Sequence, residues 1–65
     1  MNSFRKARIM AGLTQIELAK KLGVSAVSVH KWESGQALPR VKRIGEVADA
    51  LNTTVADLLK EERAV

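Results

Sequence analysis

The chain has 65 residues, a formal net charge of +4 at pH 7 and no Cys, so disulfides and thiolate metal sites are excluded. A domain of this size buries only about 60% of the surface that its unfolded chain exposes, and no apolar run approaches the ~20 residues of a membrane span. Residues 1–43 hold nine basic and two acidic side chains, which suits a polyanionic partner or, equally, a solvated basic surface.

Two short helices are predicted in the first third of the chain. Apolar and small residues at three- and four-residue steps from Phe4 indicate a helix that Gly12 ends. Thr14 and Glu17 have the spacing of a capping box, in which each side chain bonds the other residue's backbone amide, so a second helix begins there. Gly23 stands where a left-handed residue ends that helix. The residues of its apolar stripe are Ile16 or Leu18, Ala19 and Leu22.

The stretch GVSAVSVHKWESG, residues 23–35, alternates Val with Ser in the manner of a short strand. A strand needs a partner, and no other segment of the chain reads as one. Ser25 is a good N-cap and Gly35 a good C-terminal stop, so we expect a helix over about residues 26–34. The Val residues lower its intrinsic helix propensity by only a few tenths of a kcal/mol each, which packing overrides.

Two further helices are predicted after Pro39. The first has apolar residues at helical spacing, which are Val41, Ile44, Val47, Ala48 and Leu51. Gly45 costs this helix about 1 kcal/mol relative to Ala, which a close packing contact would explain, and Asn52 suits a left-handed stop. Thr54 then caps a short last helix, and a charged tail occupies residues 60–65. The apolar residues of the last helix, which either close the core or form a dimer or partner patch, are Val55, Leu58 and Leu59.

These elements make one all-α domain over residues 1–65, with a helix-turn-helix at about residues 14–34. The segments LTQIELAKKLGVSAVSVHKWESG and LPRVKRIGEVADALNTTVADLL resemble the lambda-repressor/Cro/XRE-type DNA-binding domains over nearly the whole chain. The resemblance implies a compact five-helix lambda-repressor-like domain whose helix-turn-helix is formed by helices 2 and 3. It also implies sequence-specific binding of double-stranded DNA by a small cytoplasmic regulator of transcription, foremost a repressor, of bacterial or phage-like origin. Matching the family pattern assigns core positions to Leu18, Leu22, Val24, Val29 and Trp32.

Helical geometry divides the helix at residues 26–34 into two faces. The inward set is Val29, Trp32 and Glu33, and the outward set is Ala26, Val27, His30, Lys31 and Ser34. The resemblance implies that this helix lies in the major groove, where its base-reading residues are Ala26, Val27, Ser28 and Lys31. A Lys donates to guanine O6 and N7, and the methyl groups of Ala and Val contact the thymine methyl. Lys31 is explained equally well as a solvated side chain or a phosphate contact, and Ser28 suits a base or a phosphate.

A further set of residues consists of candidates for contacts to DNA phosphates: Gln15, Ser25, His30, Gln36, Arg40, Lys42 and Arg43. By the resemblance, Gln15 also braces the recognition helix, while Ser25 serves first as a helix cap. The phase of the helix that begins near residue 40 decides which of its cations point toward a duplex. The resemblance further implies a structural pair of Arg8 with Glu33, which offsets the cost of an acidic side chain on the inward face.

Other function classes are disfavoured by the residues present. A single His without Cys or a carboxylate cluster does not suit a metal site, and no nucleophile, base and orienting group stand together, so we expect neither an enzyme nor a cofactor. No membrane association is expected. A DNA-binding domain this small contacts only one half-site, so we expect a homodimer that binds the two half-sites of a pseudo-palindromic operator. The alternative is a protein-interaction module, such as an antitoxin-like partner, and the lack of acidic residues on the outward face favours DNA.

Overall fold

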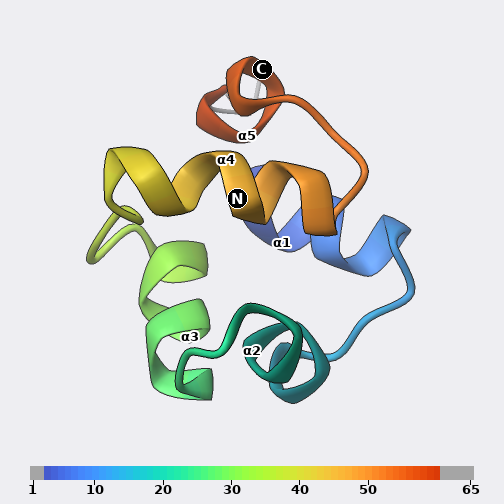
Figure 1. Ribbon diagram of the computed structural model, residues 1–65, viewed down its shortest axis with the longest axis vertical. Coiled ribbons are helices and arrows are strands. Elements are labelled where there is room, and N and C mark those ends of the chain that lie inside the picture. Colours follow the sequence, from blue (N-terminus) through green and yellow to red (C-terminus); the bar gives the residue numbers. More distant parts are fainter. Residues whose placement is uncertain (1–2, 61–65) are drawn as a thin grey trace.

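Five α-helices and no strand make up residues 3–60, the part of the chain that the computed structural model describes (Figure 1). In chain order the helices are α1 (Ser3–Met10), α2 (Gln15–Leu22), α3 (Ala26–Ser34), α4 (Val41–Ala50) and α5 (Val55–Leu59). The all-α prediction is confirmed, and residues 26–34 are helical despite their alternating sequence. Most of the tail predicted at residues 60–65 lies outside the described residues.

Side-chain caps fix where three of the helices begin. At α2, the Thr14 hydroxyl accepts a hydrogen bond from the Glu17 amide at 3.0 Å, and the Glu17 carboxylate accepts one from the Thr14 amide at 3.0 Å. Hydrogen bonding to Thr14, first from its backbone amide and second from its side chain, holds the pKa of Glu17 below its usual value of 4.5. At α3 and α5, Ser25 and Thr54 each accept a bond from the amide three residues on, at 3.2 and 3.1 Å. The predicted caps are therefore confirmed.

Left-handed residues follow the first four helices, at the predicted positions. Gly23 follows α2 with a φ of 71°, a conformation that costs a residue with a Cβ about 1–2 kcal/mol. Because the chain turns there, the Val24 amide bonds back to the Ala19 carbonyl at 3.0 Å before α3 begins. Asn52, with a φ of 55°, takes the same conformation after α4.

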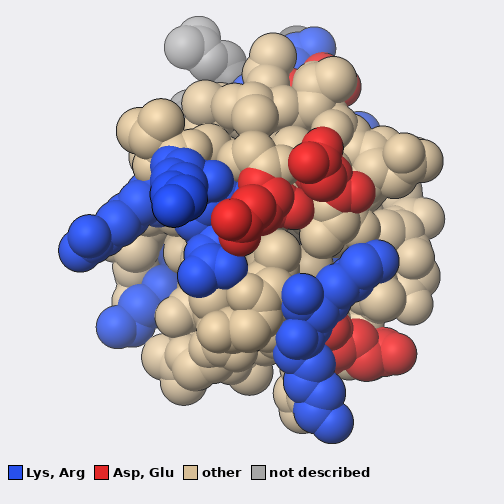
Figure 2. Space-filling model, viewed as in Figure 1, with Lys and Arg blue, Asp and Glu red and all other residues tan. Residues whose placement is uncertain are grey.

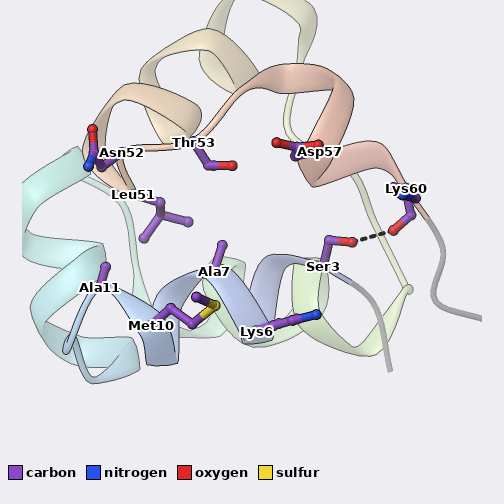
Figure 3. Close-up of a pocket in the computed structure, with 10 residues that line it drawn as sticks. All are labelled: Ser3, Lys6, Ala7, Met10, Ala11, Leu51, Asn52, Thr53, Asp57 and Lys60. Carbon is purple, nitrogen blue, oxygen red and sulfur yellow. Dashed lines mark hydrogen bonds between the residues drawn. The ribbon is translucent and has the colours of Figure 1, made fainter.

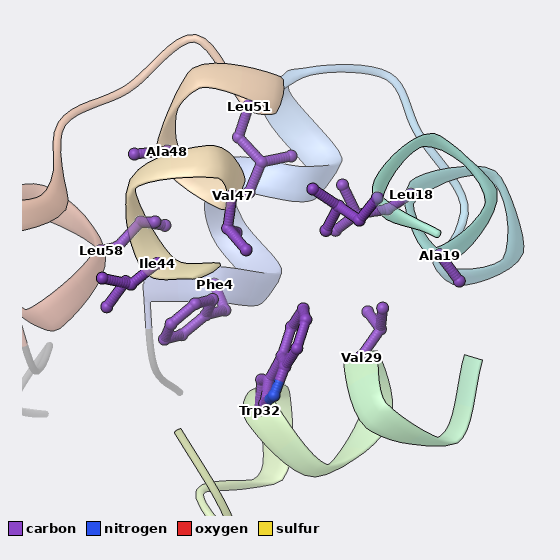
Figure 4. Close-up of a cluster of buried hydrophobic side chains, with 11 residues drawn as sticks. Phe4, Leu18, Ala19, Val29, Trp32, Ile44, Val47, Ala48, Leu51 and Leu58 are labelled. Atoms are coloured by element: carbon purple, nitrogen blue, oxygen red, sulfur yellow. The ribbon is translucent and has the colours of Figure 1, made fainter. Parts of the chain in front are cut away.

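The core is formed by side chains from all five helices (Figure 4). Its members are Phe4, Leu18, Ala19, Leu22, Val29, Trp32, Ile44, Val47, Ala48, Leu51 and Leu58. The rings of Phe4 and Trp32 lie with their centroids 6.3 Å apart and tilted by 41°, within the range that favours aromatic pairs. Leu58 is 1% exposed, so the short α5 closes the core and does not merely lie on it.

Several apolar residues lie elsewhere than their periodicity predicts. Val41 is 91% exposed because α4 begins at this residue, before the stretch that packs on the core. In α2 the buried alternative is Leu18, whereas Ile16 is 61% exposed. Val24 is half-buried and packs against the edge of the core. A Cβ at Gly45 would meet nothing within 4 Å, so the expectation of a close packing contact there is wrong.

Candidate nucleic-acid interface

The two helices α2 and α3 pack against each other and are joined by the turn at residues 23–25 (Figure 1). Ala19 in α2 is 3% exposed, and its small side chain permits the close approach of the two helices. On α3, the side chains of Val29 and Trp32 are buried in the core, where they are 1% and 6% exposed, and they hold this helix in place. The anchored helix therefore presents its opposite face to solvent.

The exposed face of α3 follows three- and four-residue steps along the helix, as the face assignment predicts. Its members are Val27, His30, Lys31 and Ser34. Val27 is 61% exposed although it is apolar, and Lys31 lies one turn after it. No acidic side chain lies on this face, which is wholly within the described part of the chain. The face combines a methyl surface with a cation.

The other two base-reading candidates are partly covered. Ala26 was expected to face outward, but it is half-buried and packs against the core, because it stands three residues before Val29 and shares its side of the helix. Ser28 is half-buried as well, and its hydroxyl lies 3.1 Å from that of Ser25. Of the four candidates, Val27 and Lys31 are thus the exposed ones.

A largely buried ion pair ties α3 to α1. Arg8 donates through Nε to Glu33 Oε2 at 2.5 Å and through Nη2 to Oε1 at 3.2 Å, and the two side chains are 12% and 5% exposed. Gln15, at the start of α2, donates to the same Oε1 at 3.1 Å, and Arg8 Nη1 donates to the Leu13 carbonyl at 2.8 Å. One carboxylate of α3 therefore accepts bonds from both α1 and α2, which fixes the orientation of α3.

The start of α4 carries the cationic candidates, and they divide into two kinds. Arg40 and Lys42 are exposed. Arg43 is half-buried and donates through Nη1 to the Leu22 carbonyl at 2.7 Å and to Glu46 at 2.9 Å. It satisfies an end carbonyl of α2 and ties α4 to that helix. Figure 2 shows basic side chains gathered over the start of α4 and over α2, with acidic side chains of α4 between them.

The remaining phosphate candidates differ in how their polar groups are engaged. The Ser25 hydroxyl caps α3, as described above, and the Gln15 amide is bonded to Glu33. His30 and Gln36 are exposed, on α3 and just after it. Two exposed lysines of α2, Lys20 and Lys21, are not among the predicted phosphate contacts. Their positive charge is the one feature of the sequence that could have indicated such a role.

A separate hollow of about 800 Å³ lies between α1 and the end of the chain that contains α5 (Figure 3). Met10 and Lys6 of α1 face Asn52 and Asp57 across it. At its rim the Ser3 hydroxyl donates to the carbonyl of residue 60, which links α1 to the end of α5. No lining residue belongs to α3, so this hollow is distinct from the exposed face of α3.

Within residues 3–60, no group of three His, Asp or Glu side chains is placed to hold a metal ion. No helix in the same range has the length and apolar character needed to cross a bilayer.

Comparisons with known proteins agree with this geometry. A family model described as helix-turn-helix matches residues 4–58. The chain is 38% identical over 45 residues, 69% of its length, to the cryptic phage CTXphi transcriptional repressor RstR of Vibrio cholerae. It is 31% identical over 61 residues, 94% of its length, to the HTH-type transcriptional activator BcrR of Enterococcus faecalis. The matches span 40% and 30% of these two relatives, and no solved structure gives a significant match.

Proposed function

The chain belongs to the helix-turn-helix family, and from that membership we propose that it is a transcriptional regulator that binds double-stranded DNA in a sequence-specific manner. In this proposal α3 is the recognition helix and lies in the major groove, which is about 12 Å wide and admits an α-helix. The observation that carries the proposal is the exposed face of α3, which bears Lys31 and no acidic side chain. The ion pair between Glu33 of this helix and Arg8 of α1 holds α3 in place.

Contacts to the DNA backbone come from the elements that flank α3. Arg40 and Lys42 supply exposed cations at the start of α4, and the N-terminus of α2, with Gln15, supplies partial positive charge and donors. Arg43 acts chiefly as a tether between α4 and α2, because its Nη1 is bonded to the Leu22 carbonyl and to Glu46. The phosphate contacts set the register of the helix, and α3 supplies the sequence preference.

The regulator acts as a repressor and binds as a homodimer to a pseudo-palindromic operator with half-sites about 34 Å apart. A domain that occupies a promoter blocks transcription by exclusion alone, whereas activation needs a further contact. The relative with the higher identity over its matched part is described as a repressor. Beside the buried Leu58, Val55 and Leu59 are 36% and 50% exposed, and they form an apolar surface for self-association.

The proposal is tested by selection of bound duplexes from a random pool at a stated salt concentration, followed by titration of the selected site. About five phosphate contacts per half-site give a log–log salt slope of about −4 to −5. Enrichment of a half-site with such a slope supports DNA recognition. A slope near zero, or no enriched sequence, contradicts it and favours the protein-interaction module. Light scattering with and without the duplex measures the stoichiometry.

Two single variants separate the roles of the cations. Arg40→Ala is expected to weaken binding to all duplexes about equally and to reduce the magnitude of the salt slope by about 0.9, as for one lost phosphate contact. Lys31→Ala is expected to change which half-sites are enriched. If both variants weaken every duplex alike, Lys31 contacts a phosphate and does not read a base.

A further inference from the structure

The hydrogen-bonding groups of α3 are mostly engaged within the protein. The Ser28 hydroxyl lies against that of Ser25, Ser34 donates to the Lys31 carbonyl at 3.2 Å, and Glu33 is bonded to Arg8 and Gln15. The helix also has no Arg, Asn or Gln, so Lys31 is its one side chain of the kinds that bind guanine or adenine by paired hydrogen bonds. Base discrimination by α3 must therefore rest on few side chains of its exposed face.

Val27 is the apolar member of that face. It stands in the first turn of α3, is 61% exposed and has a β-branched side chain with one strongly preferred rotamer in a helix. Its two methyl groups thus have a fixed direction toward solvent. The distinctive apolar group in the major groove is the C5-methyl of thymine. Contact between these groups removes apolar surface from water on both sides, with no hydrogen bond required.

The spacing of Val27 and Lys31 along α3 sets the distance between the two bases that they would contact. Four helical residues rise about 6 Å along the helix axis. For a helix that lies along the groove, this rise corresponds to about two of the ~3.4 Å steps between base pairs. Side chains four residues apart also lie on the same side of a helix. Lys31 is the exposed cation of this face, and a lysine in the major groove is suited to donate to guanine N7 and O6.

Resting on the proposed function, we propose that α3 selects its half-site through a thymine C5-methyl in contact with Val27 and a guanine in contact with Lys31, about two base pairs apart. The half-site is thus defined by the methyl group of a thymine and by the N7 and O6 acceptors of a guanine. Because α3 has no Asn or Gln, it does not recognise an adenine through a side-chain amide.

The test replaces single atoms of the DNA. In the duplex selected from a random pool, each thymine is exchanged in turn for deoxyuridine, which lacks only the C5-methyl, and each guanine for 7-deazaguanine, which lacks N7. One deoxyuridine position is expected to weaken binding about fourfold, as for the loss of one buried methyl group. One 7-deazaguanine position about two base pairs away is expected to weaken it about fivefold, as for one hydrogen bond.

Matched protein variants assign these effects to side chains. Val27→Ala is expected to abolish the sensitivity to deoxyuridine, and Lys31→Ala the sensitivity to 7-deazaguanine. Val41→Ala is the control, because it makes the same chemical change at a residue that is 91% exposed on α4, and it is expected to keep both sensitivities. Thermal unfolding checks that each variant is folded.

The outcomes distinguish this inference from the proposed function. A deoxyuridine effect that disappears in Val27→Ala, together with a 7-deazaguanine effect that disappears in Lys31→Ala, supports the inference when both effects persist in Val41→Ala. The inference is overturned if a half-site is enriched but no deoxyuridine substitution changes its affinity, or if the deoxyuridine effect persists in Val27→Ala. Either result leaves the proposed function standing. Selection that enriches no half-site overturns both.

Discussion

The ion pair that ties α3 to α1 provides a sharp test of how this small domain holds α3 in place. Arg8→Met keeps most of the aliphatic stem and removes the guanidinium. Glu33, whose side chain is 5% exposed, then keeps only the bond from Gln15, and the Leu13 carbonyl loses its Arg8 donor. The variant leaves a buried carboxylate without its opposite charge.

The expected loss is large relative to the stability of the domain. Leaving one partner of a buried pair uncompensated costs about 3–5 kcal/mol, and because Arg8 is 12% exposed we expect the lower end, about 3 kcal/mol. A chain of 65 residues has an unfolding free energy of about 3–10 kcal/mol. At about 4–8 °C per kcal/mol, the melting temperature should fall by about 12–24 °C.

Thermal and urea unfolding, followed by circular dichroism, measure this loss in three variants. Arg8→Lys keeps the charge without the two-pronged donor and should lose less than Arg8→Met. The double variant Arg8→Met with Glu33→Met removes the buried charge altogether and should regain at least half of the loss. The reasoning fails if Arg8→Met costs less than about 1 kcal/mol, or if the double variant is less stable than Arg8→Met alone.

Three further predictions concern single substitutions, two of them made as matched pairs. Gly23→Ala should destabilise by about 1 kcal/mol because φ is 71°, whereas Gly45→Ala, in a helix with nothing within 4 Å of the new Cβ, should stabilise by about the same amount; equal signs in urea unfolding would contradict this. Because the pKa of Glu17 is lowered in the folded state, the interaction of its carboxylate with Thr14 stabilises fully above pH 4.5 and loses that effect as the pH falls through the lower folded pKa. The gap in melting temperature between wild type and Glu17→Gln should therefore close in acid, and a constant gap would refute the assignment. Leu58→Ala should cost about 2–5 kcal/mol and Leu59→Ala less than about 1 kcal/mol, since they are 1% and 50% exposed; similar losses would show that α5 is not the lid of the core.

The bounds of the helices follow from the sequence because their signals are local. A cap such as Thr14 with Glu17 bonds across three residues, and a left-handed stop such as Gly23 acts within one turn, so neither depends on the rest of the fold. The same holds for the two faces of α3, where helical phase alone separates Val29 from Val27.

Tertiary packing decided what the local signals leave open. Helical phase could not say that Arg43 would bond to the end of α2 while Arg40 stayed exposed, because the answer depends on how α4 crosses α2. Nor could it show that no side chain approaches Gly45. The sequence by itself therefore determined the five helices and, apart from Ala26, the exposed face of α3. Only the packing of those helices on one another decided which candidate side chains remain available to a duplex, since that depends on neighbours distant in the chain.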